Sequence, residues 1–111
     1  MAIQENSKLL SIIIPAFNEQ DNIHRTFHAI RQILNTAPVP FEILFIDDGS
    51  GDMTWPRICE LSTEFSEVKG ISFSRNFGKE SAIFAGLEAA SGACCVIMDC
   101  DLQHPPAVIP E

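Results

Sequence analysis

Short apolar runs alternate along the chain with longer stretches in which apolar residues recur every three or four positions. The runs cover residues 10–14, 41–46, 68–73 and 93–98, and they predict four β-strands. The apolar stripes from 23 to 34, from 58 to 65 and from 79 to 90 predict three helices. Strands and helices therefore alternate, beginning and ending with a strand.

The predicted strands are apolar on both faces, which is typical of a parallel sheet covered by helices on each side. We therefore expect an α/β fold with a mostly parallel four-stranded sheet and helices on both faces. The 111 residues suffice for one such domain, over residues 1–111. Right-handed crossovers place the C-terminal ends of all strands at one edge, where ligands bind in open α/β sheets.

Polar side chains follow the predicted strands at this edge. They are Asn18 and Glu19 after the first strand, Asp47 and Asp48 after the second, Arg75 and Asn76 after the third, and Asp99 and Asp101 after the fourth. Asp99 and Asp101, two positions apart, leave their strand on the same side. Carboxylates that lie close together repel one another unless a cation shares the site. Mg²⁺ and Mn²⁺ prefer oxygen ligands and commonly bind together with substrate phosphates, although such a pair also occurs in solvated turns.

Two other groups at this edge allow two interpretations each. Asp47-Asp48-Gly49-Ser50 fits an Asx-type turn, and an aspartate there could also accept hydrogen bonds from a base or a ribose. Arg75 and Lys79 form a basic pair near the carboxylates. Lys79 starts a predicted helix, where the macrodipole disfavours a cation unless an anion is also present. It is either a phosphate contact or an ordinary solvated lysine.

Charge and composition exclude several classes of function. Seven Lys and Arg against fifteen Asp and Glu give a net charge of −8, which disfavours binding to nucleic acid or to anionic membranes. The longest apolar stretch, residues 9–17, is shorter than the roughly 20 residues of a spanning helix, so we expect no transmembrane segment. The four cysteines lack metal-ligand spacing and are interpreted as reduced thiols of a cytoplasmic protein. His24 and His28, one helical turn apart, are interpreted as surface residues.

Three segments, taken in order, resemble the motifs of family 2 glycosyltransferases with the GT-A fold. They are residues 11–19, 46–50 and 99–106, with the sequences SIIIPAFNE, IDDGS and DCDLQHPP. Residues 74–80, SRNFGKE, together with DLQHPP, are similar to the polyprenyl-phosphate branch of that family, which includes bactoprenol glucosyltransferases and dolichol-phosphate mannosyltransferases. The resemblance covers residues 11–111 and implies the Rossmann-like, nucleotide-binding half of a GT-A domain.

The resemblance implies transfer of a sugar, with inversion, from a nucleoside-diphosphate sugar such as UDP-glucose or GDP-mannose to a polyprenyl phosphate. It implies dependence on Mg²⁺ or Mn²⁺. It implies that Pro15, Phe17 and Glu19 line the nucleoside pocket, that Asp47 contacts the base and that Asp48 supports the loop carrying Asp47. It implies that Asp99 contacts the ribose or the metal, that Asp101 binds the metal and that Gln103 completes the metal shell. Arg75 and Lys79 are implied to contact the phosphates. Cys100 stands where a small residue is usual, and we expect it to face away from the metal.

Relatives of this kind continue well beyond 111 residues, so we expect the acceptor side and its catalytic residues to lie outside the chain. We expect the chain to be the N-terminal portion of an enzyme at the cytoplasmic face of the membrane, binding donor without completing transfer, and self-associating through apolar surface. One alternative is a non-catalytic module that binds sugar nucleotides. A receiver-like signalling domain fits less well, because its aspartate pair would follow the first strand. A dinucleotide-binding domain lacks its glycine motif here.

Overall fold

The computed structural model describes residues 9–36 and 39–101. Within them, the elements along the chain are β1 (Leu10–Ala16), α2 (Ile23–Leu34), β2 (Phe41–Asp47), α3 (Thr54–Glu64), β3 (Val68–Ser72), α4 (Lys79–Ala89) and β4 (Cys94–Ile97). Every predicted strand and helix is present, although β1 runs on through Pro15. Its ladder with β4 ends at Ile13 and Ile97, so the missing N–H of Pro15 interrupts no pairing on that side.

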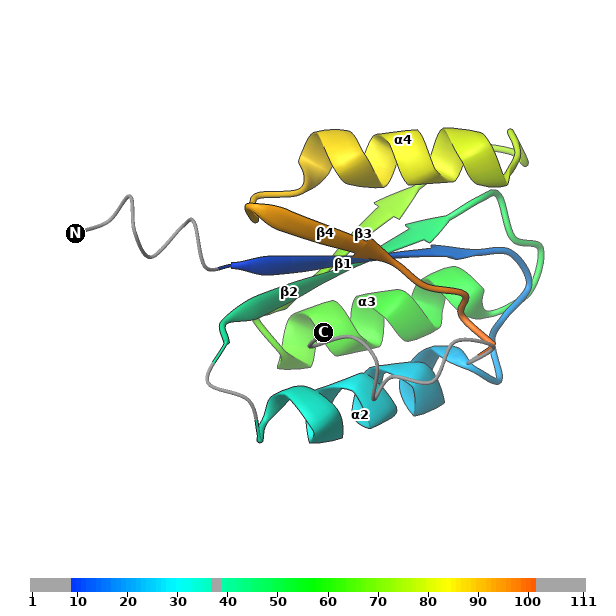
Figure 1. Ribbon diagram of the computed structural model, residues 1–111. Helices are drawn as coiled ribbons and strands as arrows, with labels where there is room; N and C mark the ends of the chain where they lie inside the picture. The colour runs from blue at the N-terminus through cyan, green and yellow to red at the C-terminus, as the bar shows by residue number, and fades with distance from the viewer. Residues whose placement is uncertain (1–8, 37–38, 102–111) are drawn as a thin grey trace.

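The four strands form a parallel sheet in the order β3-β2-β1-β4. Figure 1 shows α2 and α3 on one face of this sheet and α4 on the other. This arrangement confirms the predicted α/β fold with helices on both faces. All four strands end on the same side of the molecule, so the loops that follow them meet at one edge.

The core has two parts, one on each face of the sheet. The larger part lies under α2 and α3 and includes Ile12, Phe27 and Phe45, all fully buried. The smaller part lies under α4 around Ile13 and Leu44.

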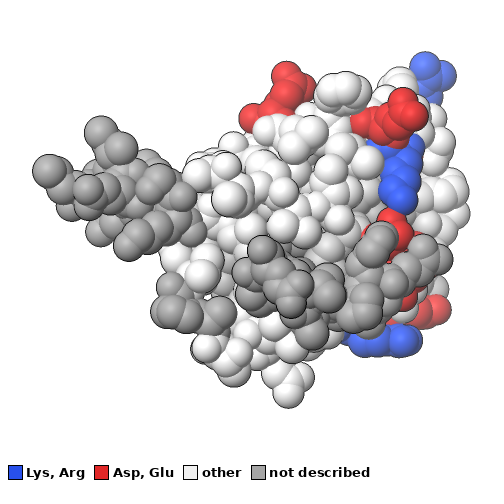
Figure 2. All heavy atoms as spheres, in the orientation of Figure 1, with Lys and Arg blue, Asp and Glu red and all other residues white. Residues whose placement is uncertain are grey.

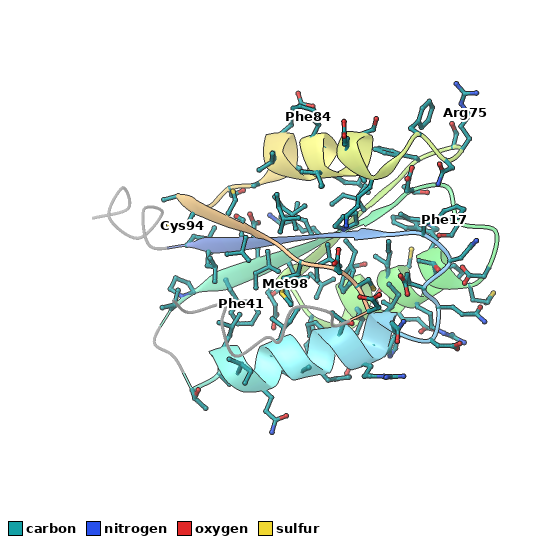
Figure 3. The ribbon with its side chains drawn as sticks, turned by 45° about the vertical axis from the view of Figure 1, so that its right-hand side comes forward. Phe17, Phe41, Arg75, Phe84, Cys94 and Met98 are labelled. Carbon is teal, nitrogen blue, oxygen red and sulfur yellow. The ribbon has the colours of Figure 1, made fainter. Side chains whose placement is uncertain are left out.

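The outer strands differ from the prediction that all four are buried on both faces. In β4, Cys94 and Cys95 are exposed, and Ile97 is 44% exposed. The prediction is wrong for β3 and β4 because both lie at the edges of the described sheet, where a helix covers them only in part. Phe84 of α4 is also exposed, and it points away from the body of the protein (Figure 3). The four cysteines are free thiols, as predicted, although only Cys100 is buried.

The edge opposite the loops is tied together by a buried carboxylate. Glu42 of β2 accepts hydrogen bonds from the Ser11 hydroxyl at 2.6 Å, from the Ser91 N–H at 2.6 Å and from Lys69 Nζ at 3.0 Å. Burial raises the pKa of Glu42, but these three hydrogen bonds outweigh it, and the net shift is downward. The carboxylate therefore joins three strands to the connection between α4 and β4. No helix among the described residues has the length and apolar character needed to cross a bilayer.

Candidate functional site

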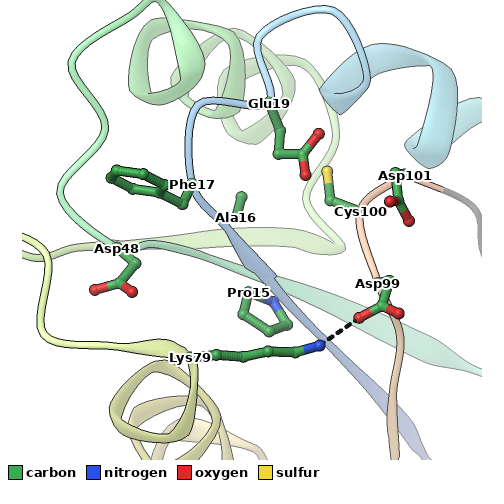
Figure 4. Close-up of a pocket in the computed structure, with 9 residues that line it drawn as sticks. All are labelled: Pro15, Ala16, Phe17, Glu19, Asp48, Lys79, Asp99, Cys100 and Asp101. Carbon is green, nitrogen blue, oxygen red and sulfur yellow. Dashed lines mark hydrogen bonds and ion pairs between the residues drawn. The ribbon is translucent and has the colours of Figure 1, made fainter.

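The loops after β1 and β4 and the start of α4 surround an open pocket of about 290 Å³. It is lined by Pro15, Ala16, Phe17, Glu19, Asp48, Lys79, Asp99, Cys100 and Asp101. Figure 4 shows these side chains, and Figure 2 shows that most charged side chains on the visible face gather toward this edge. The pocket therefore lies where the strand-end rule places a ligand.

The loop after β1 is held by hydrogen bonds to the loop after β2. Asn18 has a φ of 54°, a left-handed conformation that asparagine tolerates better than most residues. Its N–H donates to Ser50 Oγ at 2.8 Å, and its Oδ1 accepts from the Gly51 N–H at 2.9 Å. The next N–H, that of Glu19, donates to Thr54 Oγ1 at 2.8 Å. The backbone on either side of Asn18 is thereby fixed at the mouth of the pocket.

A second set of hydrogen bonds extends this connection to the start of α3. The N–H of Gln20 donates to Asp52 Oδ2 at 3.3 Å, and the N–H of Met53 donates to Gln20 Oε1 at 3.0 Å. Asp52 also accepts from the Thr54 N–H at 2.9 Å. Partial burial raises the pKa of Asp52, but the hydrogen bonds from Thr54 and Gln20 lower it by more. The two loops therefore form one preorganised rim.

Asp47 and Asp48 are both buried, and they serve different loops. Asp47 Oδ1 accepts from the N–H of Ser50 at 3.0 Å, which is the Asx-type turn that the sequence allowed. Asp47 is not among the residues that line the pocket. Asp48 lines the pocket and holds the loop before α4, because it accepts the N–H groups of Phe77 at 2.8 Å and Gly78 at 3.1 Å. The Asp48 side chain therefore stabilises the loop after β3.

The loops after β2 and β3 approach each other closely at a glycine. Gly49 has a φ of 72°, and a Cβ there would lie 2.2 Å from the carbonyl carbon of Arg75. The Arg75 guanidinium stacks over the Phe77 ring at 4.7 Å and points away from the protein (Figure 3). The structure therefore does not bring Arg75 into the pocket. Phe17, in contrast, lines it with 47% of its surface exposed.

Lys79 and Asp99 meet inside the pocket. Lys79 Nζ donates to Asp99 Oδ1 at 2.7 Å, joining the start of α4 to the segment after β4 (Figure 4). The Asp99 side chain is 20% exposed and that of Lys79 is 61% exposed. The sequence pattern predicted both residues at this edge, but nothing in it indicated that they form an ion pair. Gln103 lies outside the described residues.

Cys100 lines the pocket together with the two aspartates on either side of it in the sequence. The residue is buried and lines the pocket beside Glu19 and Asp101. Burial, together with the negative charges of Glu19 and Asp101, raises the pKa of the Cys100 thiol to about 12. The thiol is therefore protonated at neutral pH and behaves as a small apolar group.

The carboxylates of the pocket suit a cation that is bound jointly by the protein and a ligand better than one that is bound by protein side chains alone. No group of three or more His, Cys, Asp or Glu residues within 9–36 and 39–101 is arranged to hold a metal ion. His24 pairs with Glu60 at 3.0 Å on the surface, in agreement with the predicted surface position. Asp99 and Asp101 supply carboxylate oxygens at one pocket. Mg²⁺ is often bound by one or two carboxylates together with substrate phosphates, so this donor set suits a cation that arrives with a diphosphate.

Comparison with known proteins places these features in a family. The family model described as "Glycosyl transferase family 2" matches residues 11–111. The chain is 46% identical over 103 residues to the putative glycosyltransferase CsbB of Bacillus subtilis, covering 93% of this chain and 31% of that protein. It is 44% identical to the bactoprenol glucosyl transferase of Shigella phage SfV, covering 92% and 33%. It is 42% identical to the dolichol-phosphate mannosyltransferase of Pyrococcus furiosus, covering 92% and 28%.

The chain thus spans about a third of the length of these curated relatives. Solved structures share its fold. The mannosyltransferase PcManGT of Pyrobaculum calidifontis, in complex with GDP-Man and Mn²⁺, matches with a TM-score of 0.70 and 22% identity, covering 85% of this chain and 27% of that one. Residues 1–349 of S. aureus TarS, in complex with UDP, match with a TM-score of 0.66 and 23% identity, covering 83% and 27%. The fold is that of the GT-A glycosyltransferases.

Proposed function

Because the chain belongs to glycosyl transferase family 2, we propose that residues 1–111 form the nucleotide-sugar-binding portion of a GT-A enzyme. The proposed reaction of the full-length protein transfers a sugar from a UDP-glucose or GDP-mannose type donor to a polyprenyl phosphate. Relatives named bactoprenol glucosyl transferase and dolichol-phosphate mannosyltransferase, at 44% and 42% identity, support this acceptor class. Because the proposed acceptor is a lipid, we propose that the full-length enzyme acts at the cytoplasmic face of a membrane.

The observation that carries the proposal is the mixture of charges in the pocket. Asp99 and Asp101 supply carboxylates, and among the described residues Lys79 supplies the positive charge in the pocket lining. A diphosphate alone would be repelled by the carboxylates, but a diphosphate that brings a divalent cation presents both signs of charge. Mg²⁺ or Mn²⁺, when bound, would supply charge stabilisation to the diphosphate leaving group. Asp99, Asp101 and Gln103 are the residues proposed to hold it.

The rest of the pocket suits a nucleoside. The exposed ring of Phe17 and the flat side of Pro15 offer apolar surface to a base or a ribose at the rim. Glu19 is oriented by Asn22, whose Nδ2 donates to Glu19 Oε1 at 2.8 Å, and it presents a carboxylate to sugar hydroxyls. Asp47 is proposed to contact the base from the adjoining loop. The hydrogen bonds between the loops hold these groups before the ligand arrives, which lowers the entropy lost on binding.

In the proposed inverting step, a phosphate oxygen of the acceptor forms a bond to the anomeric carbon as the bond to the diphosphate breaks. The acceptor oxygen is already anionic, so the enzyme must position it and must stabilise the charge that leaves. Lys79 and, from outside the pocket, Arg75 are the described cations proposed to help with that charge. The groups that position the acceptor are proposed to belong to other parts of the full-length protein.

Calorimetry on the purified chain tests the donor site. UDP, GDP, UDP-glucose and GDP-mannose are titrated in Mn²⁺ and again in excess EDTA. We expect at least one of them to bind in Mn²⁺ and to lose about tenfold or more in affinity in EDTA. Asp101→Asn should weaken this binding, whereas Asp21→Asn, on an exposed residue outside the pocket, should not. Equal affinity in EDTA would refute the role of the metal, and absence of binding to all four would refute the donor site.

A further inference from the structure

The ion pair between Lys79 and Asp99 places a cation on the same residue that the proposed function assigns to the metal. Lys79 Nζ lies 2.7 Å from Asp99 Oδ1, inside the pocket. Figure 4 shows the Lys79 side chain passing Pro15 on its way to Asp99. A divalent cation that binds Asp99 Oδ1 must therefore displace the ammonium group. The two cations compete for the same oxygen.

The backbone of Lys79 is fixed, whereas its ammonium group is free to change partner. Asp48 accepts the N–H groups of Phe77 and Gly78, the two residues just before Lys79, and so anchors the start of α4. The Lys79 side chain is 61% exposed. Its flexible four-carbon stem lets Nζ turn from one anion to another without moving the helix. A partly exposed ion pair is also weak enough to be exchanged readily.

Charge balance gives the exchange a direction. Glu19, Asp48, Asp99 and Asp101 all line the pocket, and Lys79 offsets part of their negative charge when no ligand is present. When a divalent cation binds Asp99 together with a diphosphate, the ammonium group loses its partner and gains the phosphate oxygens as a new one. Both cations then face anions, so the ammonium group keeps an anionic partner after the metal has taken Asp99.

We propose that Lys79 is an exchangeable counter-ion that pairs with Asp99 in the unliganded pocket and passes to the diphosphate when the metal takes Asp99. This inference rests on the proposed donor site and adds to it a step in ligand binding. In this proposal Lys79 weakens the binding of the metal alone and strengthens the binding of the metal–nucleotide complex. One substitution must therefore move two affinities in opposite directions, which a purely structural role would not do.

The test measures both affinities in the same variants of the 111-residue chain. Mn²⁺ alone is titrated and followed by electron paramagnetic resonance of the free ion. UDP and GDP are titrated by calorimetry at saturating Mn²⁺. For Lys79→Met we expect Mn²⁺ alone to bind about threefold tighter, since a weak competitor is gone. We expect the nucleotide that binds best to bind about tenfold more weakly, since a charged hydrogen bond is lost. Lys79→Arg should stay within about twofold of the wild type for both.

Arg31→Met is the matched control for net charge. Arg31 pairs with Glu67 at 3.8 Å at the opposite edge of the sheet, so this variant loses the same charge away from the pocket. We expect neither affinity to change in it. Circular dichroism melting checks that each variant is folded. A Lys79→Met chain that binds Mn²⁺ no more tightly than the wild type, or that binds nucleotide equally well, overturns the exchange.

The failure of the donor site is recognised separately. A wild-type chain that binds neither UDP nor GDP in Mn²⁺ refutes the proposed function, whatever the variants do. In that case the titration with Mn²⁺ alone still decides whether Lys79 competes with the metal for Asp99. Absence of Mn²⁺ binding by the Lys79→Met chain, in which the competing ammonium group is gone, overturns the exchange as well.

Discussion

The Ser11 hydroxyl and the Glu42 carboxylate lie 2.6 Å apart on neighbouring strands, under the connection that leads from α4 to β4. The two residues are partners in the parallel ladder, so their side chains leave the sheet on the same face. Gly92 closes the group, because its N–H donates to Ser11 Oγ at 2.8 Å. These contacts hold one end of β4 in register, and the other end of β4 leads to Asp99.

Replacing Glu42 by glutamine should destabilise the fold without changing its shape. A glutamine offers one acceptor oxygen in place of two, and its amide N–H₂ would face a donor. The Ser11 hydroxyl and the Ser91 N–H both donate to Oε2, so the amide oxygen can keep these two bonds, whereas Lys69 Nζ, which donates to Oε1, would face the N–H₂ group. Losing the bond to Lys69 and the negative charge of the acceptor costs about 1–3 kcal/mol of unfolding free energy. Urea denaturation measures the loss, with the exposed Glu88→Gln as the control. A loss below about 0.5 kcal/mol would show that the buried network adds little.

The same carboxylate should make stability depend on acid pH. The folded pKa of Glu42 lies below its ordinary value of 4.5, so the folded state holds the proton less tightly than the unfolded chain. Its contribution is therefore complete above that value and is lost as the pH falls through the lower, folded pKa. We expect the stability gap between wild type and Glu42→Gln to shrink as the pH is lowered below 4.5. Urea midpoints from pH 7 to pH 3 test this, and a gap that is constant with pH would contradict it.

Gly49→Ala should be far more damaging than Gly51→Ala, although the two glycines share one loop. At Gly49 the φ is 72° and a Cβ would overlap the backbone of Arg75, whereas at Gly51 no atom lies within 4 Å of the added carbon. The strained backbone alone costs about 1–3 kcal/mol. Thermal unfolding of the two variants gives the comparison. Equal melting temperatures would mean that the loops after β2 and β3 move apart at little cost.

The cysteines should differ sharply in reactivity. Cys94 and Cys95 are exposed, whereas Cys100 is buried with its pKa raised to about 12. Because the thiolate is the reactive form, iodoacetamide at pH 8 should modify Cys94 and Cys95 first and Cys100 only after unfolding. Peptide mass spectrometry with and without urea identifies the modified sites. Rapid labelling of Cys100 in the native protein would contradict its burial.

The apolar surface over α4 and β4 should drive self-association of the chain. Phe84 of α4 is 67% exposed, and Leu87 of α4 and Ile97 of β4 are also exposed. Exposed apolar side chains and an edge strand favour association between copies. Light scattering should show a mass that rises with concentration, and less so for Phe84→Ser. A monomer at high concentration would refute this prediction.

The pattern of apolar residues predicts the elements well because it is local. The runs at residues 10–14 and 41–46 are too short and too continuous for helices, and their strand form follows from that alone. The convergence of Glu19, Lys79 and Asp99 on one pocket also follows, because parallel strands end at one edge. The family match excludes the receiver-like alternative.

The features that the sequence does not reveal depend on which segments become neighbours. The exposure of Cys95 and Ile97 follows from the place of β4 at the edge of the described sheet, and an apolar run looks the same at an edge as in the middle. The contact of Asp48 with the loop before α4 joins residues about thirty positions apart. Both depend on long-range pairing, which no local pattern encodes.

The strand order also determines when β1 can pair with each of its neighbours during protein synthesis. The N–H of Gly92 donates to Ser11, 81 residues earlier, and β4 pairs with β1. A growing chain leaves the ribosome N-terminus first, so β1, β2 and β3 can assemble while the partner on the other side of β1 is still being synthesised. During that interval the fully buried Ile12 and Ile13 belong to an unprotected edge, and Asp99 and Asp101 of the pocket have not yet emerged. Within the described part of the chain, the charged pocket is therefore completed only when β4 docks beside β1.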